Sequence, residues 1–330
     1  MMSSRLSPCL RSLWLALGLS LPAAAQTSAA SPDVPPAAPT AAPEVTPASE
    51  PPPPAPRPIP NVRVYLSSLN VVRYNPLGLE SQNRLVAQKR LFDSPSVLLR
   101  DTFVNAAVSL KLSPASYKIG PTVDIQPLAV FNLRAGYEYM QFFGTMGFLQ
   151  SYPDAFRDFS DDIREDGEDG AYSTTGHHFF VEPTLQAKVR SIALRTKFAI
   201  EYWDVALRDG ETTFYEATPD TLVPGKGWLF SNDTDLIWLG TQWTVGLRYS
   251  AVWPRYDEAQ GVTGGASANN SHMRVGPLVA YSFNMDEGTR FNRPTVLANV
   301  AWYLKHPNRE EAMPYLLVGF AFNSDLVSSR

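Results

Sequence analysis

The sequence predicts an all-β fold: a closed antiparallel transmembrane β-barrel of about 12 strands, with about 10 or 14 strands as the alternatives. Three observations predict it. Apolar and polar residues alternate with a period of two over long segments. Short and long connections between these segments alternate along the chain. The composition, 44% hydrophobic and 12% aromatic, suits a barrel with aromatic girdles. The sequence has no apolar run of the roughly 18 residues that a membrane-spanning helix needs.

The chain begins with a segment, residues 1–25, that has the three parts of a secretory signal peptide. Arg5 and Arg11 supply a positive start, Leu13 to Leu21 form a short apolar core, and three alanines at the end form a small-residue cleavage site. Cys9, the only cysteine, lies before the apolar core. Cleavage after the alanines leaves a mature chain without cysteine, which excludes disulfides, thiol catalysis and cysteine metal sites.

Removal of this segment leaves 26 basic and 32 acidic side chains, a net charge of −6, which argues against nucleic-acid binding. Residues 26–60 contain 13 of the 29 prolines, mixed with alanine, threonine and serine. Such a composition cannot build a core, so it predicts a disordered, extended periplasmic linker. The alternative is a tether that contacts the cell wall or a periplasmic partner.

The folded domain is expected to span residues 61–330. Its clearest pattern runs from Met273 to Tyr303, where two segments of alternating apolar and polar residues flank the turn residues Asp286-Glu287-Gly288. Two such strands in succession predict a transmembrane β-hairpin. Reading the same pattern along the chain gives candidate strands at 62–74, 83–92, 97–112, 116–126, 130–146, 175–189, 192–205, 226–238, 241–254, 271–285, 292–305 and 313–324.

Segment 241–254 allows a length check. Trp243 and Trp253 are ten residues apart on its apolar face, or about 33 Å along a strand. At a tilt of about 40° the vertical height is roughly 25 Å, the height of the apolar band of a membrane barrel. The two tryptophans are therefore expected at the two lipid interfaces. The alternative is a pair of core tryptophans in a soluble β-sandwich.

The connections supply an independent indication. Every link from an even to an odd strand is predicted to be short, near 93–96, 127–129, 190–191, 239–240 and 286–291. The long links, 147–174, 206–225 and 255–270, all join an odd strand to an even one. Short turns at one end and long loops at the other are typical of outer-membrane barrels, whose turns lie in the periplasm.

The signal sequence, the alternating strands and the closing segment from Tyr315 to Phe322 together resemble the bacterial outer-membrane β-barrel proteins. The resemblance covers residues 61–330 and is architectural, with no particular subfamily. It implies a location in the cell outer membrane, contact with membrane lipid and lipopolysaccharide, and insertion by the barrel assembly machinery. Many members end on an aromatic residue, whereas here eight residues follow Phe322.

The strand alternation predicts which charged side chains face the lumen. Because these seven basic groups outnumber the four acidic ones, the predicted lumen is polar and slightly cationic, and it favours anions or carboxylated solutes. Arg134, Arg195 and Arg248 lie on alternate strands at similar heights, so a row of guanidinium groups roughly 10 Å apart is expected. The alternative is that the arginines pair with the glutamates and plug the barrel. The predicted lumen residues are Lys118, Arg134, Lys188, Arg195, Lys197, Arg248, Arg274, Asp124, Glu138, Glu182 and Glu201.

Two features of the outer loops remain. Eight acidic residues lie between Asp154 and Asp169, which predicts a solvated loop or, alternatively, a segment that bridges to lipopolysaccharide through divalent cations. His177, His178 and His272 are expected near the outer rim, and His306 in another outer loop. A rim histidine near Asp169, Ser173 or Ser271 would suggest a hydrolase, although no spacing fits a catalytic triad.

The sequence contains no phosphate-binding loop, nucleotide fingerprint or metal-ligand cluster, so no cofactor and no metal are expected. The leading hypothesis is a small porin-like pore for small solutes or anions and not an enzyme. The alternatives are a closed structural or adhesive barrel that acts through its long loops and linker, and a rim-sited hydrolase.

Overall fold

The computed structural model describes residues 61–283, 291–310 and 313–329. The predicted signal peptide (1–25), the predicted linker (26–60) and the turn at 286–288 lie outside the described residues.

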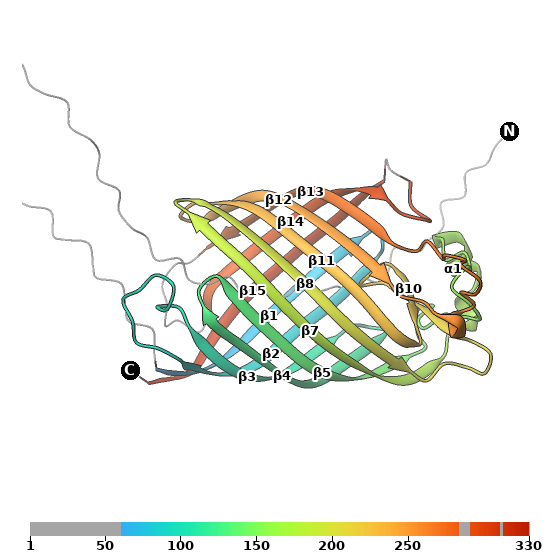
Figure 1. Ribbon diagram of the computed structural model, residues 1–330, viewed down its shortest axis with the longest axis horizontal. Coiled ribbons are helices and arrows are strands. Elements are labelled where there is room, and N and C mark those ends of the chain that lie inside the picture. Colours follow the sequence, from blue (N-terminus) through green and yellow to red (C-terminus); the bar gives the residue numbers. More distant parts are fainter. Residues whose placement is uncertain (1–60, 284–290, 311–312, 330) are drawn as a thin grey trace, which may run out of the picture.

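Twelve strands form one antiparallel sheet that closes into a barrel (Figure 1). Each strand pairs with its sequence neighbours in the sheet, and β15 pairs with β1. β1 lies beside β2, where the Arg90 amide donates to the Asn61 carbonyl at 3.0 Å. The barrel strands are β1 (Val62–Tyr74), β2 (Gly78–Arg90), β3 (Phe103–Leu112), β4 (Ser116–Leu128), β5 (Phe131–Phe143), β7 (Ser173–Val189), β8 (Ile192–Val205), β11 (Lys226–Leu239), β12 (Trp243–Pro254), β13 (His272–Ser282), β14 (Asn292–Lys305) and β15 (Pro314–Ser329).

The predicted strand number of twelve is confirmed, and the predicted bounds of β1, β8 and β14 match at both ends. The largest errors concern β2 and β3, which were predicted at 83–92 and 97–112. Residues 91–102 form a longer connection, in which the apolar Val97 is 69% exposed and the Leu98 carbonyl accepts a hydrogen bond from Ala129. The predicted short turn at 93–96 was wrong. The error arose because the apolar residues of this loop have the sequence pattern of the start of a strand.

The outer wall of the barrel is apolar. Leu247, Val318 and Trp243 are 52%, 52% and 51% exposed, whereas inward-facing leucines such as Leu297 and Leu317 are each 2% exposed. A continuous apolar surface around a closed ring of strands is not sustained in water. In lipid it is required, and a closed sheet leaves no unpaired edge there. The chain is therefore an outer-membrane type barrel whose strands span the bilayer. The sandwich alternative is excluded, since the tryptophan-bearing face of β12 points outward.

Apart from the long connection 91–102, the described links at the two ends of the barrel differ as predicted. The turns at 129–130, 190–191 and 240–242 lie at the end that carries Val62 and Ser329, and the connections 144–172, 206–225 and 255–271 lie at the opposite end (Figure 1). By the convention of such barrels, the first end is periplasmic and the second is extracellular. Within the described residues, no helix is long and apolar enough to cross a membrane.

Three prolines inside barrel strands interrupt the ladder on one side only. Pro121, Pro183 and Pro277 pair in continuous register with the preceding strand, but the register with the following strand has a gap at each proline. At two of these sites the preceding residue is glycine, and a Cβ on Gly120 or Gly276 would lie 1.9 Å from a carbonyl oxygen of the following strand. Proline has no backbone N–H to donate, and the ladder is interrupted on the side of each proline that faces the following strand. At Gly120 and Gly276 the backbone of that following strand approaches so closely that only glycine fits.

The outward position of Leu247 yields a prediction. Leu247→Arg places a guanidinium near the middle of the apolar band, and we expect it to destabilise the folded barrel in phospholipid vesicles by about 2–4 kcal/mol. Denaturant unfolding followed by tryptophan fluorescence measures the change. Thr241→Arg, in an exposed turn, is the matched control and should alter the free energy of unfolding little. Equal effects of the two substitutions would contradict the lipid-facing assignment.

Candidate functional site in the barrel lumen

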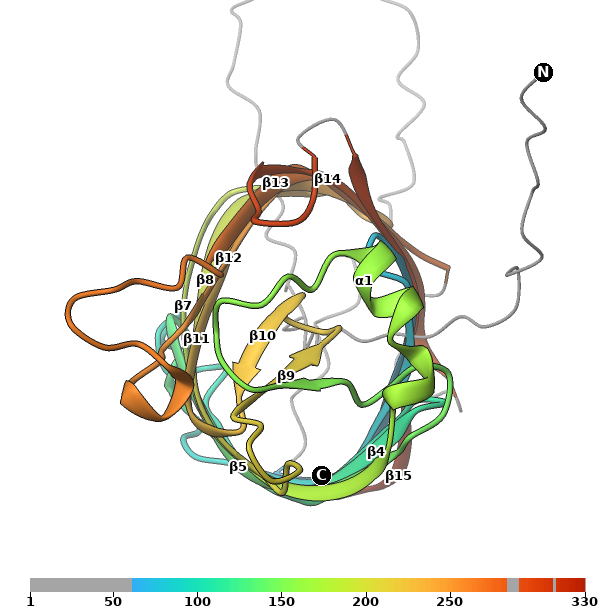
Figure 2. The same ribbon diagram turned by 90° about the vertical axis from the view of Figure 1, so that its right-hand side faces the viewer.

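The extracellular mouth of the barrel is filled by its own loops. The connections 144–172 and 206–225, here called the cap, contribute a three-stranded sheet of β6 (Ser151–Tyr152), β9 (Thr213–Glu216) and β10 (Thr221–Pro224). They also carry the short helices α1 (Asp161–Asp166) and η1 (Glu168–Gly170), while η2 (Glu258–Gln260) lies in the next loop. Viewed along the barrel, β9 and β10 lie inside the ring of strands (Figure 2). Every residue of β9 and β10 is buried.

An apolar core attaches the cap to the barrel wall. Phe214 and Val223, both 0% exposed, pack against the inward-facing ends of β5, β8, β11 and β12, including Met140 and Trp203. A second cluster joins Tyr215 and Leu222 of the cap hairpin to other parts of the cap. Burial of this many large side chains makes the cap a folded layer that closes the mouth.

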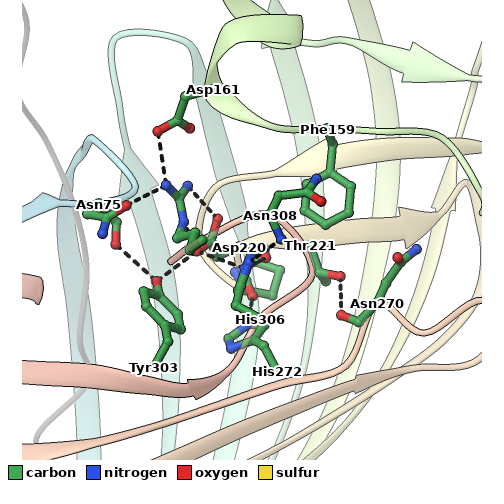
Figure 3. A network of polar contacts seen from close by, with 12 residues as sticks. Asn75, Phe159, Asp161, Asp220, Thr221, Asn270, His272, Tyr303, His306 and Asn308 are labelled. Atoms are coloured by element: carbon green, nitrogen blue, oxygen red, sulfur yellow. Dashed lines mark hydrogen bonds and ion pairs between the residues drawn. The ribbon is translucent and has the colours of Figure 1, made fainter. Parts of the chain in front are cut away.

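Asp220, in the turn between β9 and β10, is the centre of a buried polar network (Figure 3). Its carboxylate accepts hydrogen bonds from Arg309 Nε at 2.6 Å and Nη2 at 2.9 Å, from Tyr303 Oη at 2.8 Å and from Tyr215 Oη at 2.7 Å. His306 Nε2 lies 3.3 Å from the same carboxylate. We call this set the Asp220 network. It joins the cap hairpin to β14 and to the loop that follows it.

The Asp220 network extends to two more segments. Arg309 also donates to the side chain of Asn75, in the β1–β2 turn, and to Asp161 of α1 at 3.0 Å. A single guanidinium thus connects the cap helix, the cap hairpin and the first turn of the barrel. Because an arginine fork binds several oxygen acceptors in fixed directions, it holds these three segments in one arrangement.

Further hydrogen bonds surround this centre. Arg73 of β1 donates to the Thr218 carbonyl at 2.9 Å, and Thr221 Oγ1 donates to the Asn270 carbonyl at 2.9 Å. His272 Nε2 lies 2.5 Å from the Pro219 carbonyl. The cap hairpin is therefore bonded to β1, to β13 and to the β12–β13 loop as well as to Arg309.

Charge governs the acid–base behaviour of this network. Burial alone would raise the pKa of the Asp220 carboxyl, but the charge of Arg309 and hydrogen bonds from His306 and Arg309 hold that pKa well below its usual range. Burial raises the pKa of the Tyr215 hydroxyl, and the adjacent Asp220 charge raises it further. Asp220 is therefore ionised and Tyr215 neutral at physiological pH.

Below the cap, charged side chains form an alternating chain across the lumen wall. Arg84 Nη2 lies 2.6 Å from Asp124, and Arg134 Nε lies 2.5 Å from the other oxygen of Asp124. Arg134 Nη1 also lies 3.4 Å from Glu182, which in turn binds Lys197 Nζ at 3.0 Å. This chain crosses β2, β4, β5, β7 and β8, so five strands contribute to one ionic network.

A second group continues it on β8, β11 and β12. Asp235 binds Arg195 Nη2 at 2.5 Å and Arg248 Nε at 2.6 Å. The eight residues of the two groups are called the charge belt: Arg84, Asp124, Arg134, Glu182, Lys197, Arg195, Asp235 and Arg248. The predicted row of free guanidinium groups does not occur, because Arg134, Arg195 and Arg248 are all paired with carboxylates.

A third cluster surrounds His178. The ring nitrogens of His178 lie 3.2 Å from Glu138 and 3.0 Å from Glu201, and Lys111 Nζ lies 2.8 Å from Glu138. Lys118 lies 3.3 Å from Glu216 of the cap and 4.7 Å from the ring centre of Trp203. Lys118, Glu138 and Glu201, three of the predicted lumen residues, thus each have a charged partner.

Two predicted lumen residues behave differently. Lys188 is exposed near the periplasmic turn, outside the charge belt. Arg274 faces the lumen from β13 and stacks on Tyr315, with 4.0 Å between the guanidinium carbon and the ring centre. Its side chain forms no hydrogen bond and no ion pair with the described residues.

The charged lumen residues that the sequence analysis missed include Arg84, Lys111, His178, Asp233 and Asp235. The bounds of β2 and β3 were predicted with errors of several residues, and Arg84 and Lys111 were assigned to neither the lumen face nor the lipid face. On β11, Asp233 and Asp235 alternate with Leu236 and Trp238. This alternation could have placed the two aspartates on the lumen face, but the faces of this strand were not assigned. His178 was recognised only as a rim residue.

The outer loops give the hydrolase hypothesis no support. No histidine nitrogen in the described chain is hydrogen-bonded to a serine or threonine hydroxyl. His177 bonds to Tyr137 Oη at 2.8 Å, while Ser173 and Ser271 bond to groups other than histidine. In the acidic segment, Asp154 pairs with Arg157, and Asp161 pairs with Arg164 and Arg309. No described group of three His, Cys, Asp or Glu side chains is placed to hold a metal ion.

No protein-family model and no curated protein matches this sequence. Similar solved structures include the KdgM porin, with 9% identity, a TM-score of 0.34, and coverage of 78% of this chain and 98% of that one. The translocator domain of the autotransporter NalP from Neisseria meningitidis has 9% identity, a TM-score of 0.35, and coverage of 80% and 88%. The Acinetobacter baumannii outer membrane protein Omp33 has 9% identity, a TM-score of 0.33, and coverage of 81% and 98%.

The Asp220 network yields a prediction. Asp220→Asn removes the buried charge partner of Arg309 and leaves only Asp161, whose side chain is 57% exposed. Loss of one partner of a buried ion pair costs about 3–5 kcal/mol in comparable sites. We expect the cap to open locally, so that limited proteolysis of protein in vesicles cleaves 206–225 much faster than in the wild type. Asp162→Asn, an exposed change on α1, is the control and should not alter cleavage.

The pH dependence has a definite sign. A carboxyl whose pKa is depressed in the folded state stabilises the cap fully above the ordinary aspartate value of about 3.9 and loses that contribution below it. Cleavage of the wild-type cap should therefore be constant from neutral pH down to about pH 5. Opening of the cap between pH 7 and pH 5 would contradict the assigned role of Asp220.

Proposed function

We propose that the protein is a narrow porin-like pore for small solutes, closed at its outer mouth by the cap in the conformation described. The observation that carries this proposal is the partial exposure of the charge belt inside a closed barrel. The side chains of Arg134, Arg195 and Lys197 are 17%, 17% and 29% exposed, although the barrel wall shields them from the outside. Water therefore reaches the belt within the lumen.

The belt also supports a weak preference for anions. It contains five cations and three carboxylates, a surplus of two positive charges. Because most of the cationic charge is paired, selectivity would come from this surplus and not from a row of free arginines. The expected solutes are small, since twelve strands leave little space once the side chains fill it.

The cap favours a second candidate, a sealed barrel that acts through its outer loops. An apolar core and the Asp220 network hold the cap in the mouth, and an immobile cap would prevent passage. In this second proposal the loops contact lipopolysaccharide or another surface, and residues 26–60 attach the barrel to the cell wall. The first strand begins with Val62 at the periplasmic end, where it pairs with Ser329, which supports the placement of that linker. Under either proposal, the barrel assembly machinery would insert the chain.

Conductance distinguishes the two candidates. We expect the purified wild-type protein in a planar bilayer to give small, infrequent openings. Asp220→Asn should raise the open fraction several-fold, because it weakens the attachment of the cap. Asp162→Asn is the control and should behave as the wild type does. Absence of current from both wild type and Asp220→Asn would support the sealed barrel instead.

Selectivity gives a separate prediction. Asp235→Asn removes the carboxylate that binds both Arg195 and Arg248, so the belt gains one net positive charge and two freed guanidinium groups. The reversal potential in a potassium chloride gradient, measured in the Asp220→Asn background, should shift toward the chloride equilibrium potential. Asp93→Asn, with its exposed side chain near the periplasmic end, should leave it unchanged. No shift with Asp235→Asn would show that the belt does not set selectivity.

A further inference from the structure

We propose that Arg274 is the centre of an anion-binding site in the lumen that takes a small carboxylate or a similar oxoanion. This inference names a ligand class for the lumen and so deepens the proposed function. It concerns a residue outside the charge belt, on the wall formed by β12, β13 and β14.

The first support is the absence of a protein partner. Every arginine side chain of the charge belt is bound to a carboxylate, whereas the Arg274 side chain forms no hydrogen bond or ion pair within the described chain. Its Nη1 is buried and has no hydrogen-bond partner. Leaving such a donor unsatisfied is costly, and an anion in the lumen would satisfy it.

The second support is a neighbouring free donor. Arg248 is 3% exposed, and Asp235 occupies its Nε and Nη2, but its Nη1 is also buried without a partner. Arg274 pairs in register with Ser250, two residues along β12 from Arg248. Diagonal neighbours on one face of an antiparallel pair lie about 7–8 Å apart, a span that two arginine side chains and one bridging oxoanion can cover.

Local charge favours an anion over a cation. Arg195, Arg248 and Arg274, on β8, β12 and β13, face Asp233 and Asp235 on β11, a surplus of one positive charge, while Asp220 of the cap is bound by Arg309. Asp233 and Asp220 both act on Arg274 electrostatically, but neither forms an ion pair with it in the described chain, and Asp233 accepts a hydrogen bond from Ser250 Oγ at 2.6 Å. The Arg274 guanidinium therefore keeps an unused donor for a ligand.

The surroundings limit the ligand to a small one. Tyr303, the register partner of Arg274 on β14, is 2% exposed, and Tyr315, on which Arg274 stacks, is 3% exposed. The Tyr303 hydroxyl also binds Asp220, so the site lies directly below the cap. A planar oxoanion the size of acetate matches the planar fork of an arginine that is already fixed by stacking.

Binding of trifluoroacetate, followed by fluorine NMR line broadening on the full mature protein in detergent micelles, tests this site without requiring conduction. We expect saturable binding to the wild type and a dissociation constant at least about tenfold larger for Arg274→Gln, the loss expected when charge-assisted hydrogen bonds are removed. Arg63→Gln, which changes a paired lumen arginine near the periplasmic end, is the matched control and should bind as the wild type does.

Arg274→Lys keeps the charge but removes the fork, so it should bind with intermediate affinity and report on the site if the glutamine variant fails to fold. Acetate should displace the probe at lower concentration than chloride does. No saturable binding to the wild type, or equal binding by wild type, Arg274→Lys and Arg274→Gln, would overturn the proposal. A sealed barrel that nevertheless binds the probe would refute the pore and leave this site standing.

Discussion

Closure of the backbone hydrogen-bond ladder is the constraint on which the rest of this structure depends. β1 pairs with β15 along its whole length, from Val62↔Ser329 to Tyr74↔Leu316, and β1 lies beside β2. In lipid, an unpaired sheet edge would expose donors and acceptors that nothing can satisfy. A closed ring of strands leaves no unpaired edge and so removes this free-energy cost. In such a ring, alternate side chains of each strand face the lipid, and the others face an enclosed lumen.

Enclosure then determines the chemistry of the interior. A charge inside a narrow barrel loses much of its hydration, and an opposite charge must compensate for it. Asp124 and Asp235 each bind two arginines, and Glu182 binds an arginine and a lysine, so few carboxylates hold many cations. The Asp220 carboxylate in the cap is compensated in the same way, by four residues that come from β9, from β14 and from the loop after β14. The side chain of Arg274 departs from this rule, and the proposed anion site rests on that departure.

Much of the fold was predictable because strand alternation and loop asymmetry are local properties of the sequence. The bounds of β8 and β14 and the inward positions of Arg134, Arg195 and Arg248 followed from the period of two. The ionic partners were predictable only in part. The alternative of arginine–glutamate pairing holds for Arg134 and Glu182, but Arg195 and Arg248 meet at Asp235, on a strand whose faces were unassigned. The inward fold of the cap also lacked a local signal, since β9 and β10 are short and gain their burial from the barrel walls.

The central claim is that the chain forms one closed ring with this register and these faces, and disulfide cross-linking across the β1–β15 seam tests it most directly. In a Cys9→Ser background, Val72→Cys and Val318→Cys lie opposite each other in register. Oxidation of protein folded in vesicles should join this pair rapidly, and the off-register pair Val72→Cys with Phe320→Cys far more slowly. Equal rates for the two pairs, or no cross-link in the first, would contradict the closed barrel.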